Sequence, residues 1–392
     1  MSPLPFWRSR SVRRIAVQTA FIAILVAGLG LAIVTAHINL AAQNMTSGFA
    51  FLTKSTAWEM NFALLPVSRD DPYWWFMLMG VLNTLFMGVI GLSGATAIGL
   101  VVGLMRSGRN PAARLLGTIY IEVFRNLPLI VQLYFWYAVA TSLPGPRQAL
   151  QAHGFLASSR GIYTPGLGVS YGAAVQMLTA LAVGGLAAVW FVTAQRFRKV
   201  ERPARRAGLW AILGVTLATC ILAAVLGHEP GTLWITTPEL AGLSIKGGVR
   251  IQPEILSLAL AIMLYGGAYV GEIVRGGFKA VGRGQIEAAR ALGLTNWQVF
   301  ARVRMPLAFR AMLPILINQY VWLIKATTLG IAVGFSDFFM VIATSITHSG
   351  QTLELIGILM AGFLCINFTL AAVLNRLNRA IALKGNLVGV AT

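Results

Sequence analysis

The sequence predicts an all-α fold: a polytopic membrane helix bundle of about eight transmembrane helices, with a cytoplasmic helix pair between the sixth and seventh. Of its 392 residues, 57% are hydrophobic and only 11% are charged, and the mean hydropathy is +0.74. These values lie outside the range of soluble domains. A transmembrane helix needs roughly 20 apolar residues. The stretches that meet or nearly meet this length are 15–36, 73–105, 115–141, 173–194, 207–227, 255–273, 311–333 and 355–374.

The positions of the basic residues orient these spans. When the first terminus is placed inside and the spans alternate, the inside segments hold 23 Lys and Arg and the outside segments hold six. Only Arg125 and Lys325 fall within spans. Cytoplasmic segments of membrane proteins are enriched in Lys and Arg, so we expect an inner-membrane protein with both termini in the cytoplasm. The net charge of +19 then reflects topology and contact with membrane lipid, and no nucleic-acid binding is expected.

The segment between the sixth and seventh spans is the one long cytoplasmic stretch without a membrane-length apolar run. Residues 285–292 are compatible with a short helix, and Gly293 follows where a left-handed cap would end it. Thr295 and Gln298 form a capping-box pattern that begins a second helix, expected to run towards Pro306. We expect this pair to dock into another protein. A pair lying on the lipid surface and a DNA-binding pair are the alternatives.

Three stretches around this segment resemble a known family. The chain reads Tyr-Val-Gly-Glu-Ile-Val-Arg-Gly-Gly-Phe from Tyr269 and Glu-Ala-Ala from Glu287; Gly293 follows after three residues, and Val-Arg-Met-Pro begins at Val303 after nine more. The pattern resembles the signature of permease subunits of binding-protein-dependent ABC importers, which is Glu-Ala-Ala, three residues, Gly, nine residues and Ile-x-Leu-Pro. Val303 and Met305 replace Ile and Leu, and a docking face should tolerate these apolar exchanges.

Two further motifs are similar to the polar amino acid subfamily of these permeases. One reads Glu-Val-Phe-Arg-Asn-Leu-Pro from Glu122; the other reads Lys-Ala-Thr-Thr-Leu from Lys325, where the family usually has Asp-Thr-Ser-Leu after the Lys. The layout is similar to one permease of the general L-amino-acid importers.

We divide the chain into an N-terminal extra span with its outside loop (1–72), the first part of the permease core (73–141), inserted loops with two extra spans (142–250), the second part of the core with the coupling helices (251–379) and a cytoplasmic tail (380–392).

The resemblance implies that the chain is the transmembrane permease half of an ATP-driven importer, which moves amino acids from a periplasmic binding protein into the cytoplasm by alternating access. The implied partners are a cytoplasmic ABC ATPase dimer, the binding protein and a second permease subunit. A related but different chain is expected as that subunit, and a second copy of this chain is the alternative. The sequence contains no Gly-x-x-x-x-Gly-Lys-Ser/Thr phosphate loop, so we expect ATP and Mg on the separate ATPase, and neither enzyme activity nor a bound cofactor here. An ion-coupled secondary transporter of small polar solutes is the alternative.

The resemblance also implies which residues couple the permease to the ATPase. They are Glu287, Ala288, Ala289, Gly293 and Pro306. In this interpretation Glu287 is a polar contact or cap, the two alanines permit close approach, and Gly293 forms the turn.

Charged residues in spans are candidates for the substrate path, because they are costly in hydrocarbon. A helix from Leu115 would place Arg125 roughly 15 Å deep, where it could accept a substrate carboxylate while Glu122 meets an ammonium group. Alternatively, Glu122 and Arg125 pair with each other, or residues 115–125 lie on the cytoplasmic surface. The candidates are Glu122, Arg125, Gln132, Lys325 and Thr327 for the path, and Glu272 with Arg275 for a gate or hinge. The four His residues are spread one to each outside loop, so no metal site is expected.

Overall fold

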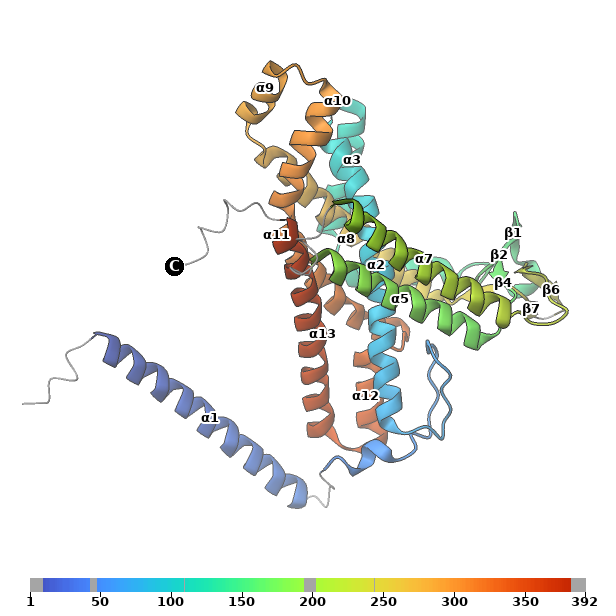
Figure 1. Cartoon of the computed structure of the whole chain (residues 1–392). Helices are drawn as coiled ribbons and strands as arrows, with labels where there is room; N and C mark the ends of the chain where they lie inside the picture. The colour runs from blue at the N-terminus through green and yellow to red at the C-terminus, as the bar shows by residue number, and fades with distance from the viewer. Residues whose placement is uncertain (1–9, 43–47, 109, 194–201, 243, 382–392) are drawn as a thin grey trace, which may run out of the picture.

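The computed structural model describes residues 10–42, 48–108, 110–193, 202–242 and 244–381 (Figure 1). Its long helices are α1 (Arg10–Ala42), α2 (Tyr73–Ser107), α5 (Tyr171–Thr193), α7 (Arg202–Leu226), α8 (Pro253–Ala280), α11 (Met305–Lys325) and α13 (Thr352–Ile381). The shorter helices are α3 (Pro111–Asn126), α4 (Leu129–Thr141), α9 (Arg283–Ala291), α10 (Asn296–Gln298) and α12 (Phe338–Ser349). The 3₁₀-helical segments are η2 (Ala50–Thr53), η3 (Pro146–Gln148) and η5 (Ala326–Val333), and η4 (Val299–Arg304) is a π-helical segment.

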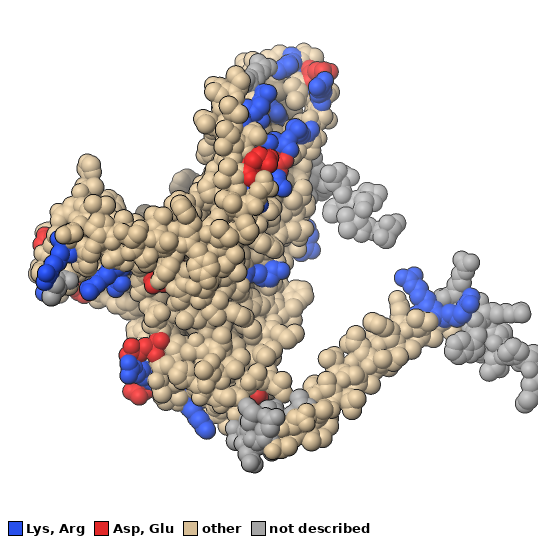
Figure 2. Space-filling model, turned by 180° about the vertical axis from the view of Figure 1, so that it is seen from behind, with Lys and Arg blue, Asp and Glu red and all other residues tan. Residues whose placement is uncertain are grey.

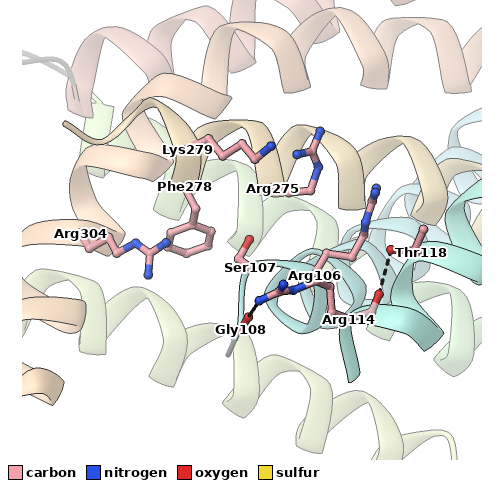
Figure 3. Close-up of a pocket in the computed structure, with 9 residues that line it drawn as sticks. All are labelled: Arg106, Ser107, Gly108, Arg114, Thr118, Arg275, Phe278, Lys279 and Arg304. Atoms are coloured by element: carbon pink, nitrogen blue, oxygen red, sulfur yellow. Dashed lines mark hydrogen bonds between the residues drawn. The ribbon is translucent and has the colours of Figure 1, made fainter. Parts of the chain in front are cut away.

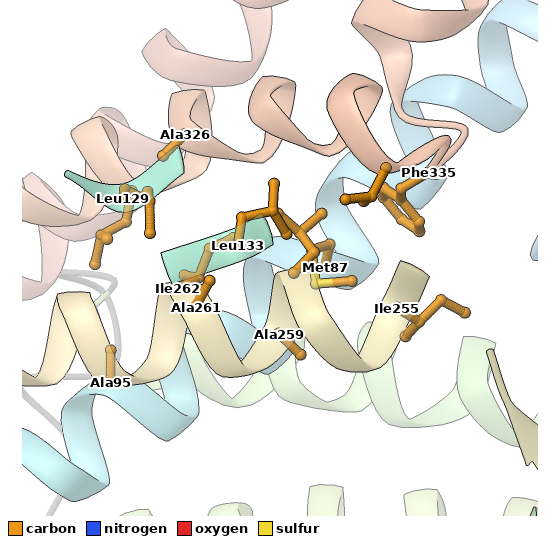
Figure 4. Close-up of a cluster of buried hydrophobic side chains, with 13 residues drawn as sticks. Met87, Ala95, Leu129, Leu133, Ile255, Ala259, Ala261, Ile262, Ala326 and Phe335 are labelled. Atoms are coloured by element: carbon orange, nitrogen blue, oxygen red, sulfur yellow. The ribbon is translucent and has the colours of Figure 1, made fainter. Parts of the chain in front are cut away.

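Helix α8 lies at the centre of the bundle, where it packs against α2, α4 and α11. The largest buried cluster forms along these contacts and includes Met87, Leu133, Ile262 and Leu323, none of which has exposed surface (Figure 4). In lipid, such helices associate through close van der Waals packing, because the surrounding acyl chains are as apolar as the side chains. The apolar pattern therefore predicts the spans, and the fit between side chains decides how they pack.

Small residues at every fourth position allow α2 to approach α8 closely. They are Gly91, Ala95, Gly99 and Gly103, which share one face of α2. A Cβ atom placed on Gly99 would lie 2.5 Å from the side chain of Val270 on α8. This is the small-residue spacing that permits close helix contact in membranes.

The third predicted span, 115–141, is not one helix. Within the described residues, seven helices are long and apolar enough to cross a membrane, compared with the eight predicted spans, and the third divides into α3 and α4. Leu127 is extended at φ −86° and ψ 128°, and Pro128 caps α4. A residue that precedes proline avoids the helical conformation because of a steric clash with the proline ring. The prediction of a continuous helix here was wrong for that reason.

The inserted loops before and after the two extra spans contain short antiparallel strands. They are β1 (Leu150–Ala152), β2 (Phe155–Ser158), β3 (Gly161–Thr164), β4 (Gly166–Leu167), β5 (Ile235–Thr236), β6 (Glu239–Ala241), β7 (Ser244–Lys246) and β8 (Val249–Ile251). One sheet has the order β1-β2-β3-β8, and β4 pairs with β5 and β6 with β7. Because β3 precedes α5 and β8 follows α7, with Tyr163 opposite Arg250, the inserted helices leave from and return to one strand unit (Figure 1).

The helices outside the central bundle expose apolar surface. Helices α5 and α7 pack along each other, and α5 also contacts α13. Helix α1 stands apart from the bundle in Figure 1, and none of the residues in its most apolar window is buried. Exposed apolar helices of this length suit a bilayer, because a helix satisfies its own backbone hydrogen bonds in hydrocarbon.

Candidate functional site

The turn between α9 and α10 has the backbone that the sequence predicts. Gly293 adopts a left-handed φ of +76°, and the N–H of Leu294 donates to the carbonyl oxygen of Ala289 at 3.3 Å. Glycine is favoured there because it lacks the Cβ atom that strains this conformation. The N–H of Gln298 donates to the Thr295 hydroxyl at 3.3 Å, and the N–H of Thr295 donates to the Gln298 side chain at 2.9 Å. The structure confirms both the glycine cap and the capping box.

The same element presents an exposed face with apolar side chains. Ala289 is buried where α9 contacts η4, whereas Glu287 and Ala288 are exposed. Leu292 and Trp297, on either side of the turn, leave 81% and 72% of their surface exposed. Large apolar side chains this exposed, and this close together in the chain, offer a surface that another protein can cover.

The second helix of the predicted pair does not end near Pro306. Helix α10 continues through the π-helical turn η4 into α11, so that one helical segment runs over Asn296–Val333. The N–H of Met305 reaches back to the carbonyl oxygen of Phe300. This wider turn places Pro306 in the first turn of α11, where a missing N–H is tolerated. The predicted pair is therefore one short helix, α9, packed against the end of a long one.

A carboxylate held by two arginines lies near the α9 end of α8. Oε2 of Glu272 accepts a hydrogen bond from Nη1 of Arg106 on α2 at 2.5 Å. Arg275 donates to the same carboxylate through Nε, at 3.1 and 3.0 Å, and through Nη2. The predicted gate or hinge residues thus lie together, and the structure adds Arg106, which joins α2 to α8. Charge-assisted bonds of this kind are stronger than neutral ones.

Because the helix breaks between α3 and α4, Glu122 and Arg125 do not lie where a continuous span would place them. Both are exposed on α3, and in the described part of the chain no ion pair joins them. Glu122 accepts a 3.4 Å hydrogen bond from the Asn126 side chain. The Arg125 guanidinium lies over the ring of Tyr269 on α8, 5.1 Å from its centre. The depth predicted for Arg125 from a continuous helix does not apply, because α3 ends at Asn126.

The other three predicted path residues differ in burial. Gln132 is buried, and its Nε2 donates to the carbonyl oxygens of Phe124 at 2.9 Å and Leu127 at 3.0 Å, which the helix break leaves free. Thr327 is also buried, and its hydroxyl donates to a carbonyl oxygen of the preceding turn at 2.8 Å. Lys325 is exposed. Two of the three therefore hold the backbone in place.

Comparison with known proteins matches residues 95–384 to the family described as "Binding-protein-dependent transport system inner membrane component". The chain belongs to this family. The permease is 36% identical over 356 residues to the putative amino-acid ABC transporter permease protein YhdX of Escherichia coli K12, which covers 88% of each chain. It is 34% identical over 360 residues to the general L-amino acid transport system permease protein AapQ of Rhizobium johnstonii, which covers 88% of this chain and 86% of that protein.

Among solved structures, an amino acid ABC transporter crystallised with histidines is 19% identical, with a TM-score of 0.46, and covers 78% of this chain and 94% of its own. The resemblance inferred from the motifs is confirmed by the family match and by the relatives that align over most of the chain. The permease is accordingly a multi-pass protein of the inner membrane.

An aromatic group beside Arg125 was not predicted from the sequence. Tyr265 stacks on Trp322 of α11, with ring centres 5.4 Å apart, and donates a hydrogen bond to the hydroxyl of Tyr269 at 3.2 Å. Aromatic faces attract cations, so Tyr269 positions Arg125 where α3 packs on α8. The four-residue spacing of Tyr265 and Tyr269, which places both on one helix face, is the sequence signal that was available.

Replacing Gln132 with leucine is expected to destabilise the permease by about 1–3 kcal/mol. Leucine fills a similar volume but leaves the two carbonyl oxygens at the helix break without their donor. The unfolding temperature of the purified protein in detergent measures the effect. Gln176→Leu is the matched control, because Gln176 is exposed on α5. An equal loss of stability in both variants would show that the Gln132 hydrogen bonds do not support the break.

Proposed function

We propose that the permease forms one half of the translocation pathway of an ATP-driven importer, which moves amino acids from a periplasmic binding protein into the cytoplasm by alternating access. The observation that carries the proposal is the alignment with YhdX and AapQ, both described as amino-acid permeases, along 88% of the chain. The exposed turn at α9 supplies the contact that such an importer needs for its motor.

In this proposal α9 enters a groove of the separate ATPase, which holds ATP and Mg. Glu287 makes a polar contact, Ala288 permits close approach, and Ala289 fixes the helix to the bundle. Leu292 and Trp297 anchor the turn in apolar pockets of the ATPase. Because α10, η4 and α11 are one helical segment, a displacement of this turn would pass directly into the membrane, with Pro306 at the start of α11.

The proposed complex contains a second permease subunit, a related but different chain, and a binding protein on the opposite side of the membrane. If α3 and α4 together form one interrupted crossing, the seven candidate spans and this crossing give eight crossings of the membrane. That count keeps both termini in the cytoplasm and leaves 23 of the basic residues on the inner side. It assigns the strand unit to the periplasmic side.

For the substrate path we propose that exposed charged side chains bind the amino acid and that buried polar side chains hold the backbone around it. Arg125, held over Tyr269, would accept the carboxylate of an amino acid, and Glu122 on the same helix would meet its ammonium group. Lys325 is the second cation. Gln132 and Thr327 shape the path by holding the backbone. Glu272 and Arg275 would act as a hinge where α2 meets α8.

Uptake of labelled amino acids into proteoliposomes that contain the permease with its partner subunits tests the function. Glu287→Lys and Gly293→Asp are expected to lower ATP-driven uptake at least tenfold, a loss of coupling of about 1.4 kcal/mol or more. Both variants should insert into the membrane but lose the ATPase during purification. The first reverses the charge of the proposed contact, and the second strains the left-handed turn.

Matched controls separate the docking face from general effects. Glu229→Lys makes the same charge reversal at an exposed site in the loop after α7. Gly231→Asp, in the same loop, strains a glycine with φ +85° whose added Cβ atom would meet nothing within 4 Å. Neither control should change ATPase retention. Uptake that persists without the ATPase, follows an ion gradient and ignores the α9 variants would overturn the proposal in favour of a secondary carrier.

A further inference from the structure

A pocket lined by basic side chains lies where α2, α3, α8 and η4 meet. Its volume is about 350 Å³, within the range of small-molecule sites. Its lining consists of Arg106, Ser107, Gly108, Arg114, Thr118, Arg275, Phe278, Lys279 and Arg304 (Figure 3). Figure 2 shows Lys and Arg gathered at this end of the molecule, with smaller acidic patches among them.

The pocket has more positive charge than the one neighbouring carboxylate can balance. Five of the lining residues are cations, and none is acidic. The neighbouring carboxylate of Glu272 is shared between Arg106 and Arg275. The remaining three cations therefore lack a carboxylate partner in the described part of the chain, which favours an anion in the pocket.

The unpaired cations point to a ligand with several acceptor oxygens. Nε of Arg304 is buried and has no hydrogen-bond partner among the described residues, while its guanidinium lies 5.2 Å from the ring centre of Phe278. Within the described residues, the Lys279 side chain has no hydrogen-bond or ion-pair partner, and the Arg114 side chain donates only to the carbonyl oxygen of Gly108, at 3.1 Å. A buried donor without an acceptor is costly, and an anion in the pocket would remove that cost.

We propose that this pocket binds a phosphate group, either the headgroup of an anionic phospholipid or free phosphate. Arginine forks match the geometry of phosphate oxygens, and lysine adds a point charge. The pocket lies at the ends of the candidate spans α2 and α8, beside the arginine that joins them. Basic pockets between transmembrane helices on the cytoplasmic side suit lipid headgroups, so the position favours phospholipid. A bound phosphate would link α2, α3, α8 and η4 through one anion and stabilise their arrangement around the turn.

Native mass spectrometry of the full transporter complex, titrated with phosphatidylglycerol or phosphatidylcholine, tests the proposal. Phosphatidylglycerol should bind in preference to the net-neutral lipid. Arg114→Gln/Lys279→Gln is expected to weaken that binding about thirtyfold, and Lys279→Gln alone about fivefold. The single variant guards against misfolding, because the Lys279 side chain has no partner among the described residues to lose. Arg283→Gln/Arg302→Gln removes the same charge from exposed positions outside the pocket and should leave the affinity unchanged.

Inorganic phosphate in a second titration distinguishes the two sources. If phosphate binds with the same dependence on Arg114 and Lys279 while phosphatidylglycerol does not, the ligand is free phosphate. If only the lipid shows that dependence, it is the headgroup. Pocket variants that bind both probes as tightly as the unmodified complex would overturn the proposal. It would also fail if the pocket variants lost the ATPase and kept anion binding, because the pocket would then be a protein contact.

Discussion

Gly99→Leu is expected to destabilise the permease by about 3 kcal/mol and to lower sharply the amount of folded protein in the membrane. The Cβ position at Gly99 lies 2.5 Å from Val270 and 2.9 Å from the backbone nitrogen of Gly271. Val270 is almost fully buried, and neither it nor the backbone can move aside without separating α2 from α8. Because α8 also packs against α4 and α11, the damage spreads through the central bundle.

The unfolding temperature in detergent and the folded yield measure this effect. Gly214→Leu is the matched control, because Gly214 also lies within an apolar helix, α7, but a Cβ atom there meets nothing within 4 Å. That variant should be unchanged or slightly more stable, since leucine favours helix more than glycine does. Similar losses in both variants would mean that the close contact of α2 with α8 does not limit stability.

Glu272→Gln is expected to destabilise the permease by about 2 kcal/mol. Arg106 and Arg275, whose side chains are only 15% and 23% exposed, would then face each other without the carboxylate between them. Glutamine keeps the size of the side chain but not its charge, so the loss is electrostatic. If Glu272 also serves as a hinge, uptake will fall further than stability alone explains.

Thermal unfolding of Glu272→Gln, Arg106→Gln and the double variant separates the pair from its surroundings. The double variant should lose less stability than the two single losses combined, because the second change removes a group that has already lost its partner. Glu122→Gln is the control for charge, since Glu122 is exposed on α3. Strictly additive losses would show that Glu272 and Arg106 do not stabilise each other.

Local features of the coupling element were predictable because they depend on neighbouring residues. The cap at Gly293 and the capping box of Thr295 and Gln298 are each recognised from a few consecutive residues. Their backbone geometry follows from steric limits and from hydrogen bonds between residues close in the sequence. Pro306 was misread for the opposite reason. A proline usually ends a helix, and only the π-helical turn η4 before it lets the segment continue into α11.

The substrate-path candidates show where prediction from spacing fails. Arg125 was placed by counting residues along one helix, and Pro128 interrupts that helix. The proline and its effect on Leu127 were visible in the sequence. The position of Arg125 over Tyr269 was not, because the two residues are distant in the chain and meet only when α3 packs on α8.

The sequence by itself determined that this protein is a helical membrane protein, which family signature it carries and where the turn at Gly293 and the cap at Thr295 lie. These properties follow from apolar length, charge distribution and local backbone chemistry. Only the tertiary structure decided that Arg106 completes the Glu272 cluster, that Gly99 meets Val270 and that five cations from four elements line one pocket. Side chains far apart in sequence become neighbours only through the register and angle of helix packing, which depend on the shapes of all the contacting surfaces together.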